Sequence, residues 1–531
     1  MKRTVALLIC FCSFYYSYAQ RPVDVLHYSF SLELNDKNDT IYGRARITFT
    51  TNKELSSVTL DLHNILQGKG MKVMQVLWDP FSSSPLSFRH EKDKVFIETG
   101  KIAANDTAWL TIIYKGIPAN GLIISKNKYG KRTFFSDNWP NRAHHWIPCV
   151  DDPADKASVE FAITAPSHYQ VVSNGIQVEE TTLPDQKKLT RWKEEVPLPT
   201  KVMVIGVADF AVNLAGNIGC IPVSSWVFPE NKANGFYDYA QAKDILEWYI
   251  NYIGPYAYQK LANVQSKTIF GGMENAGAIF YFENSVTGKR TEESLIAHEI
   301  VHQWFGNSAT EKSFAHLWLS EGFATYLTHV YLESRYGTDS LNTRMQDDRN
   351  EIIDFVTQSH RPVVDSTSDL MRLLNTNSYQ KGSWVLHMLR RQLGDSVFRK
   401  SIQEYYTKYA GSNAETKDLQ QVFERVSGKT LSQFFNQWLH TGVNPALTIR
   451  WKYLADMKKL SVTVEQLQEG TVFQLPLEIL LVLPGNKKVY RTLEINSRAQ
   501  TLLLPLEEMP LYFEADPKTS LLFEGKVSEM K

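Results

Sequence analysis

A short run of histidine and glutamate in the middle of the chain constrains its fold more than any other feature. The run is His298-Glu299-Ile300-Val301-His302, and Glu321 follows after eighteen intervening residues. Residues four apart share one face of a helix, so His298 and His302 can present two imidazole nitrogens to one metal ion. Two histidines and one glutamate with an open fourth position are typical of a catalytic zinc site, because structural sites add a fourth protein ligand. We predict one Zn²⁺ per chain, bound by His298, His302 and Glu321 from two antiparallel helices.

The residues around this run decide between a metal site and an ordinary pair of hydrogen-bonded histidines. The five-residue pattern alone leaves these two interpretations about equally open. The rest of its segment is apolar, and so is Leu317–Tyr326, which contains Glu321. Polar side chains in an apolar interior are costly unless they are coordinated or hydrogen-bonded. The context therefore favours a buried metal centre, in which Glu299 can reach a water molecule on the metal.

Two more motifs accompany the metal-binding pattern. They are Gly271-Gly272-Met273-Glu274-Asn275 and Tyr379-Gln380-Lys381-Gly382, and Glu321 itself lies in Trp318–Tyr326, WLSEGFATY. Together these segments resemble the gluzincin aminopeptidases, the family of aminopeptidase N and leukotriene hydrolase. The first motif is similar to the family's G-x-M-E-N exopeptidase motif and the second to its Y-x-K-G motif. The resemblance covers four motifs in the family's order within residues 271–382.

The resemblance implies a zinc aminopeptidase that removes the N-terminal residue from peptides. Glu299 would act as the general base, and Tyr379 would stabilise the oxyanion. Glu274 would bind the free amino group of the substrate, with Gly271, Gly272, Met273 and Asn275 beside it in the substrate-binding segment. Two other interpretations stay open: an epoxide hydrolase of the leukotriene type, and a non-catalytic binding protein on the same scaffold.

The segment Phe135–Pro153 departs from the family pattern at one position. It is similar to a loop that reaches into the active site of relatives, where a Gln or Glu helps to hold the substrate's amino group. A gap-free comparison puts Trp139 at that position. Trp139 is therefore a candidate substrate-binding residue, which either stacks on the substrate or packs in the core. The departure leaves the preferred N-terminal residue open.

The chain of 531 residues is long enough for three or four domains. Alternation with period two predicts an N-terminal β-sandwich or saddle over residues 20–209. Helical spacing predicts a mainly α domain over residues 210–443, which the resemblance identifies as thermolysin-like. Alternation returns in residues 444–531 and predicts a small C-terminal β-sandwich. The predicted fold is thus α+β and multidomain, and it resembles a short form of the family without the C-terminal helical domain.

Within the mainly α domain, individual segments are predicted from their periodicity. Val264–Phe270 is predicted as a strand. Helices are predicted at Tyr237–Tyr252, Leu317–Tyr336, Ser383–Leu393, Phe398–Tyr409, Leu419–Val426 and Leu431–Leu439.

Met1–Ala19 has a basic start, a short apolar run and a small-x-small end, which are the marks of a secretory signal peptide. A buried first strand or an uncleaved anchor is the alternative. We expect an exported protein, periplasmic or secreted, without a stable membrane anchor, because the apolar run is too short to span a bilayer. Lys plus Arg and Asp plus Glu each number 57, so charge gives no indication of a nucleic-acid partner. The expected partners are peptides with a free N-terminus, and the expected state is a monomer.

The cysteines exclude a disulfide framework. Cleavage of the signal peptide would leave Cys149 and Cys220, and a bridge between these two is the less favoured interpretation.

Overall fold

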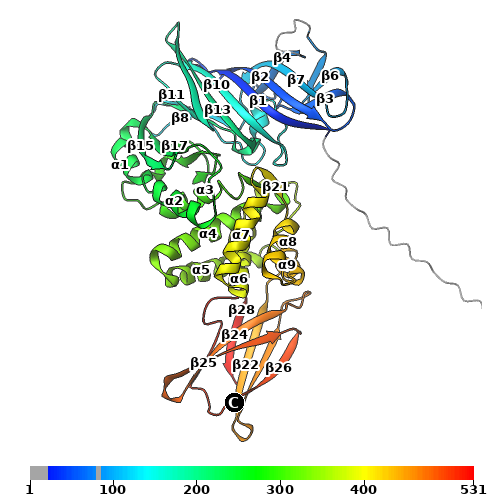
Figure 1. Ribbon diagram of the computed structural model, residues 1–531, viewed down its shortest axis with the longest axis vertical. Helices are drawn as coiled ribbons and strands as arrows, with labels where there is room; N and C mark the ends of the chain where they lie inside the picture. The colour runs from blue at the N-terminus through cyan, green and yellow to red at the C-terminus, as the bar shows by residue number, and fades with distance from the viewer. Residues whose placement is uncertain (1–21, 79–84, 531) are drawn as a thin grey trace, which may run out of the picture.

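A computed structural model describes residues 22–78 and 85–530. Its elements form three groups along the long axis: strands at one end, helices in the middle and a second set of strands at the other end (Figure 1). The predicted signal peptide, Met1–Ala19, lies outside the described residues. Among the helices of the described part, none combines the length and the apolar content needed to cross a membrane.

The first group consists of three sheets. A seven-stranded sheet has the order β12-β13-β10-β1-β2-β7-β4. Its strands are β12 (Ile176–Leu183), β13 (Lys187–Pro199), β10 (Lys156–Pro166), β1 (Val23–Glu33), β2 (Ile41–Thr51), β7 (Thr107–Ile117) and β4 (Gly70–Leu77). The smaller sheets are β3 (Leu55–Asp61), β6 (Lys94–Ile102) and β5 (Phe88–Glu91), and β11 (Gln170–Ser173), β14 (Ile205–Ala208), β9 (Arg132–Ser136) and β8 (Leu122–Lys126).

Alternating side chains explain why these segments form strands. In β1 the apolar residues Tyr28, Phe30 and Leu32 are buried, while residues between them are more exposed. Successive side chains of a strand point to opposite faces, so one face of the sheet enters the core. The predicted N-terminal β region is confirmed, and it is made of several sheets rather than one.

The second group begins with a sheet that the sequence analysis largely missed. Its strands follow the order β15-β16-β17-β19-β18, with β18 at the edge. They are β15 (Ala211–Ile218), β16 (Ile221–Val227), β17 (Leu261–Ser266), β19 (Ala278–Phe282) and β18 (Gly272–Met273). The strand predicted at Val264–Phe270 is β17, and it ends earlier because Thr268 and Ile269 turn to donate hydrogen bonds to Asp137 (3.1 and 3.2 Å).

Nine named α-helices follow or accompany this sheet in the described part of the chain. They are α1 (Lys232–Tyr239), α2 (Ala242–Tyr252), α3 (Glu293–Val301), α4 (Trp318–Tyr336), α5 (Thr338–Val356), α6 (Gly382–Leu393), α7 (Asp395–Tyr409), α8 (Thr416–Ser427) and α9 (Ser432–Leu439). The predicted helical region is confirmed, with two corrections.

The first correction concerns Tyr237–Tyr252, which is two helices rather than one. Gln241 Nε2 donates to the carbonyl oxygen of Asp238 (2.8 Å), the acceptor that the amide of Ala242 would use in a continuous helix. The second correction is α5, which the sequence analysis did not predict. Its helix is largely polar and buries only Leu341, Met345, Asp348 and Ile352.

The third group contains two sheets near the C-terminus. One has the order β26-β23-β22-β28 and the other β25-β24-β27. The strands are β22 (Ala446–Leu454), β23 (Lys459–Gln466), β24 (Leu475–Leu483), β25 (Lys487–Ile495), β26 (Ala499–Pro505), β27 (Tyr512–Ala515) and β28 (Glu524–Glu529). The two sheets touch through the stacked rings of Trp451 and Phe513, whose centroids are 5.7 Å apart.

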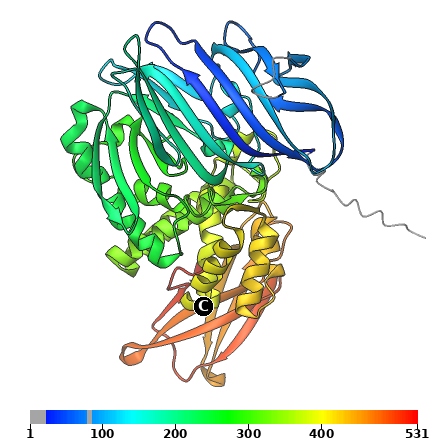
Figure 2. The ribbon, with the colours of Figure 1, turned by 45° about the horizontal axis from the view of Figure 1, so that its top comes forward.

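The N-terminal strands pack onto the middle of the molecule, and the C-terminal strands lie beyond α7, α8 and α9 (Figure 2). One contact between the first two groups is made by Lys156 of β10. Its Nζ donates to the carbonyl oxygens of Asn307, Ser308 and Ser412 at 3.2, 2.7 and 3.0 Å. The loop after α3 is thereby held from the N-terminal side. Cys149 is buried and Cys220 is exposed, and both are free thiols, so there is no bridge between them.

Candidate metal centre and active site

Three side chains from α3 and α4 converge on one point. His298 Nε2 and His302 Nε2 are 3.1 Å apart, and Glu321 Oε2 lies 3.4 and 3.3 Å from these two nitrogens. Ligand atoms about 2.0–2.1 Å from a tetrahedral zinc ion are about 3.3 Å from one another. Among the described residues, this is the group of histidine, cysteine and acidic side chains close enough together to hold a metal ion. The donor set and its spacing therefore fit zinc.

The orientation of the His302 ring is fixed by contacts of Nδ1, the ring nitrogen that does not face the other candidate ligands. Its Nδ1 lies 3.2 Å from the carbonyl oxygen of Phe305 and 3.0 Å from Oγ of Ser320. A proton on Nδ1 that is donated to this carbonyl leaves Nε2 with a free lone pair, which is the form that binds metal. Ser320 precedes Glu321 in α4, so the same turn supplies one ligand and supports another.

Burial and neighbouring charges shift the pKa values of three side chains in the site. Burial alone would raise the pKa of Glu321, but the imidazoles of His302 and His298 outweigh it and hold that pKa below its usual range. Burial raises the pKa of Glu299 well above its ordinary value, and the carboxylates of Glu274 and Glu321 raise it further. The pKa of Tyr379 is raised well above its ordinary value by burial and by the same carboxylates. Tyr379 is therefore protonated at neutral pH.

A cleft of about 570 Å³ opens onto these groups. Ten of the eleven residues predicted for the site line it: Trp139, Gly271, Gly272, Met273, Glu274, His298, Glu299, His302, Glu321 and Tyr379. The exception is Asn275, which is fully buried behind the cleft wall.

The sequence analysis missed part of the cleft lining. Thr325, Thr328 and His329 on α4 line the cleft, and so does Ser294 on α3. The helical repeat could have identified them, because they follow Glu321 by four, seven and eight residues and Ser294 precedes His298 by four. The cleft thus has polar lining residues from both helices, and Phe270 and Leu374 add apolar lining that packs with the cluster containing Trp139.

Two glycines bring the third metal ligand and Tyr379 together. A Cβ added to Gly322 would lie 2.9 Å from the Cα of Gly382, so α4 and α6 cross with their backbones in contact. Gly322 follows Glu321, and Gly382 ends the turn Asn377–Lys381 that carries Tyr379. The Tyr379 ring lies parallel to the ring of His298, with the centroids 6.1 Å apart. The glycine in each motif therefore has a packing reason.

Glu274 lines the same cleft. Gly272 and Met273 form the edge strand β18, which pairs with β19, and Glu274 follows directly. Glu274 is 6 % exposed, and its charge is close enough to raise the pKa values of both Glu299 and Tyr379. The carboxylate thus lies near the metal ligands in a largely buried setting.

Trp139 both packs and lines the cleft, so the two alternatives for this residue are not exclusive. It makes edge-to-face contacts with Phe270 and Phe314 at centroid distances of 6.2 and 6.1 Å. Its neighbour Asn138 donates to the carbonyl oxygens of Thr200 (3.1 Å) and Met203 (2.7 Å). The loop is therefore held at the base of Trp139.

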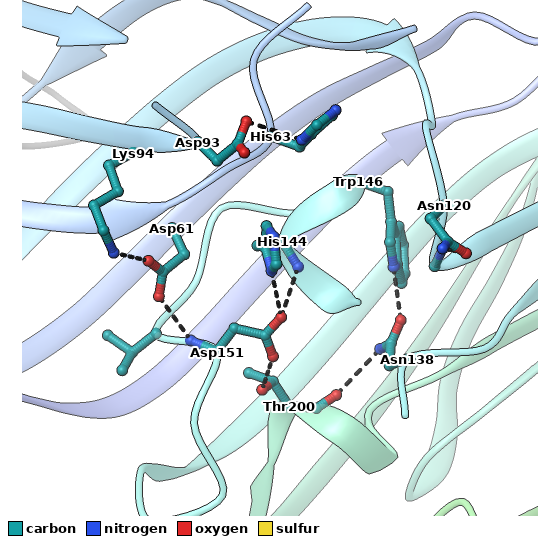
Figure 3. A network of polar contacts seen from close by, with 12 residues as sticks. Asp61, His63, Asp93, Lys94, Asn120, Asn138, His144, Trp146, Asp151 and Thr200 are labelled. Atoms are coloured by element: carbon teal, nitrogen blue, oxygen red, sulfur yellow. Dashed lines mark hydrogen bonds and ion pairs between the residues drawn. The ribbon is translucent and has the colours of Figure 1, made fainter. Parts of the chain in front are cut away.

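Figure 3 shows how the rest of this loop is held in place. Trp146 Nε1 donates to Asn138 Oδ1 at 2.8 Å. The carboxylate of Asp151 lies 2.7 Å from Nδ1 of His144 and accepts a hydrogen bond of 2.7 Å from the hydroxyl of Thr200. These bonds connect both ends of the loop to the segment around Thr200, so the cleft wall at Trp139 is anchored in the N-terminal sheets.

Comparison with known proteins places this geometry in a family. The model of the peptidase M1 N-terminal domain matches residues 24–202, and that of the peptidase family M1 domain matches residues 237–438. The chain belongs to the M1 peptidase family. The M1 match over residues 237–438 contains the three candidate zinc ligands, Glu299, Glu274 and Tyr379.

Several aminopeptidases are similar to the chain. Probable aminopeptidase 2 of Sulfurisphaera tokodaii is 28% identical over 521 residues, which are 94% of this chain and 62% of that protein. Aminopeptidase M1-C of Oryza sativa subsp. japonica is 30% identical over 327 residues, covering 58% of this chain and 37% of its own length. Glutamyl aminopeptidase of Bos taurus is 28% identical over 333 residues, with coverages of 59% and 34%. The chain thus spans between about a third and two thirds of these relatives.

Proposed function

We propose that the protein is a zinc-dependent aminopeptidase that removes the N-terminal residue from peptides. The observation that carries this proposal is the meeting of two groups in one cleft: the cluster of His298, His302 and Glu321, and the carboxylate of Glu274. The three metal-binding side chains alone would be compatible with any metallohydrolase. A buried carboxylate beside it suits a substrate that brings its own positive charge.

The chemistry divides among this chain's residues in a simple way. A bound zinc ion supplies a Lewis acid that activates water and polarises the scissile carbonyl. Glu299 accepts the proton of the attacking water and gives it to the departing nitrogen. Tyr379 donates its phenolic hydrogen to the developing oxyanion.

Glu274 gives the reaction its exopeptidase character. It accepts hydrogen bonds from the ammonium group of the substrate, and an internal peptide bond has no such cation. Endoproteolytic binding would leave this carboxylate buried without a partner, which is costly. The free backbone edge of β18 lies beside the same position and suits an extended peptide.

We also propose the domain organisation and the location that the sequence analysis predicts. Residues 20–209, 210–443 and 444–531 are proposed as an N-terminal β domain, a thermolysin-like catalytic domain and a C-terminal β-sandwich. The chain is proposed to be exported, periplasmic or secreted, and to act as a monomer. The non-catalytic alternative is not favoured, since every candidate ligand and catalytic residue is kept in the sequence. The epoxide-hydrolase alternative is not favoured, since the similar proteins named above are aminopeptidases.

The test compares one peptide with a free amino terminus and the same peptide acetylated. We expect the purified protein to release the first residue of the free peptide and to leave the acetylated form largely uncut. Equal cleavage of the two forms would rule out the amine-anchor role and the exopeptidase assignment with it. Zinc content measured on the same sample should be close to one ion per chain.

A further inference from the structure

The backbone of Glu274 is held by two side chains from the segment that follows α3. Gln303 Nε2 donates to the carbonyl oxygen of Glu274 at 2.7 Å, and Asn307 Nδ2 donates to the same oxygen at 2.6 Å. Gln303 also accepts a hydrogen bond from the amide of Gly277 at 2.8 Å. Both amide side chains are buried. One carbonyl oxygen thus receives two donors, which fills its accepting capacity.

These two side chains are tied to a metal ligand. Gln303 follows His302 directly in the chain, and the amide of Asn307 donates to the carbonyl oxygen of His302 at 3.0 Å. The metal ligand His302 is therefore connected to Glu274 by two routes, and each route passes through a single residue, Gln303 or Asn307. Such short, buried hydrogen-bonded connections fix the position of Glu274 relative to His302, because close-packed protein interiors leave little room for displacement.

The segment after Glu274 is held from the other side as well. Asn174 in the N-terminal group donates to the carbonyl oxygens of Ala276 (2.8 Å) and Val202 (2.9 Å), and accepts from the amide of Val204 (2.7 Å). The turn that carries Glu274 is fixed between α3 and the N-terminal sheets. Its carboxylate then has a defined place relative to the metal ligands.

We propose that Gln303 and Asn307 are positioning residues that set the distance between the amine-binding carboxylate of Glu274 and the metal centre. The metal centre determines where the peptide bond breaks, and Glu274 determines where the amino terminus lies. The spacing between them decides that one residue is removed. This inference rests on the proposed aminopeptidase function, and neither side chain lines the cleft, so each acts through Glu274 rather than on the substrate.

The first experiment replaces the donors while keeping the volume. Gln303→Met removes the bonds to Glu274 and Gly277 and a longer one, of 3.4 Å, to the carbonyl oxygen of Glu299. Asn307→Leu removes only the bond to Glu274, because Asn307 Oδ1 has no hydrogen-bond partner among the described residues. We expect each variant to raise KM for a free-amine substrate about tenfold, with kcat changed by less than about threefold, since displacement of a binding group by about 1 Å can cost up to a hundredfold. Cleavage of the acetylated substrate should not change.

The control is Gln437→Met. Gln437 is buried in α9 and makes the same two kinds of bond, donating to the carbonyl oxygen of Gln474 (3.0 Å) and accepting from its amide (2.9 Å). It does not line the cleft. We expect this variant to lose as much thermal stability as Gln303→Met and to keep the wild-type KM. An equal rise in KM in both variants would overturn the proposal, because the effect would then be general destabilisation.

A double-mutant cycle with Glu274→Ala gives the decisive measurement. That substitution removes the carboxylate but leaves the backbone carbonyl and its two donors. Gln303→Met should have no further effect on the ratio of free-amine to acetylated cleavage in this background, because the group that it positions is gone. Full additivity would overturn the proposal. A wild-type protein without a free-amine preference would overturn both this proposal and the aminopeptidase function, whereas a preference that is undiminished in Gln303→Met and Asn307→Leu overturns only the positioning role.

Discussion

Gly272 lies directly against Glu299, so that a Cβ added to the glycine would come within 2.6 Å of Glu299 Cγ and overlap the carboxyl group. The edge strand β18 and the helix α3 thus approach each other at the proposed general base. Only a residue without a side chain fits between the edge strand β18 and this acid.

We expect Gly272→Ala to lower kcat about a hundredfold, because the added methyl group displaces the Glu299 carboxyl group from the attacking water. Zinc content should stay at the wild-type level. The matched control is Gly271→Ala, where the nearest atom to the added Cβ is Leu295 Cδ1 at 3.8 Å, an ordinary contact. A variant Gly272→Ala as active as Gly271→Ala would show that Glu299 is not constrained by this strand.

Glu299→Gln should keep the metal and lose most of the turnover. The amide has the shape of the carboxyl group but cannot accept the proton of water, so kcat should fall by a factor of about 10²–10⁴. Elemental analysis and steady-state kinetics on the same sample check both parts. Retained activity together with retained zinc would assign the proton transfer to another residue.

Removal of the metal should abolish activity and lower the melting temperature, since a ligand that binds only the folded state stabilises it. Dialysis against a chelator followed by calorimetry and assay measures both effects. Zn²⁺ should restore them at about one equivalent, whereas in Glu321→Gln, which lacks one anionic ligand, restoration should need far more metal. Full activity in metal-free protein would contradict the proposed chemistry.

Peptides with an acidic first residue should be poor substrates. The cleft wall near Glu274 is formed by apolar side chains such as Trp139, Phe270, Met273 and Leu374, and none of its described lining residues is a lysine or arginine. A glutamyl side chain would lose its hydration there without gaining a cation. We expect kcat/KM for a glutamyl substrate at least about a hundredfold below that for a leucyl substrate. Comparable values from a fluorogenic panel would mean that a cation reaches this wall.

The free energy of unfolding should increase as pH rises above neutrality, because the buried Lys381 loses its proton in the folded state first. Burial lowers its pKa to about 7, and its Nζ has only long contacts of 3.5 and 3.4 Å to the carbonyl oxygens of Thr441 and Val443. Lysine in an unfolded chain titrates near about 10.4, so between these pH values the unfolded state binds more protons and stability rises with pH. One proton corresponds to a slope of about 1.4 kcal/mol per pH unit.

Lys381→Met should therefore raise the melting temperature at pH 7 and flatten its rise toward pH 10. Lys417→Met, on the exposed side of α8, is the control and should leave both unchanged. Calorimetry at several pH values provides the comparison. A stability difference between Lys381→Met and wild type that stays constant across this range would show that Lys381 does not titrate there.

The candidate metal ligands and much of the cleft could be predicted because helical geometry is local. His298 and His302 share a face through the repeat alone, and Glu321 could be assigned from its apolar context. The strands around Tyr28, Phe30 and Leu32 were predicted for the same reason. Each of these predictions needed only the spacing of neighbouring residues.

Features that depend on long-range contacts were missed. α5 is a largely polar helix whose buried residues contact other elements, and β18 is a two-residue strand that exists only because β19 lies beside it. The donors to the Glu274 carbonyl come from residues some thirty positions away, Gln303 and Asn307. No periodicity indicates such a bond, so the part of the site that sets distances appeared only with the structure.

The strand β18 has a consequence for which chain ends can enter the cleft. It is two residues long and lies at the border of its sheet, with Glu274 immediately after it. A polypeptide that pairs with such a border must be stretched out over its first residues, and an amino terminus wound into a helix cannot do so. Disordered termini and short peptides from proteolysis satisfy this requirement, whereas the terminus of a well-folded protein does not if it lies within secondary structure. In the proposed aminopeptidase, selection by conformation thus precedes selection by side chain.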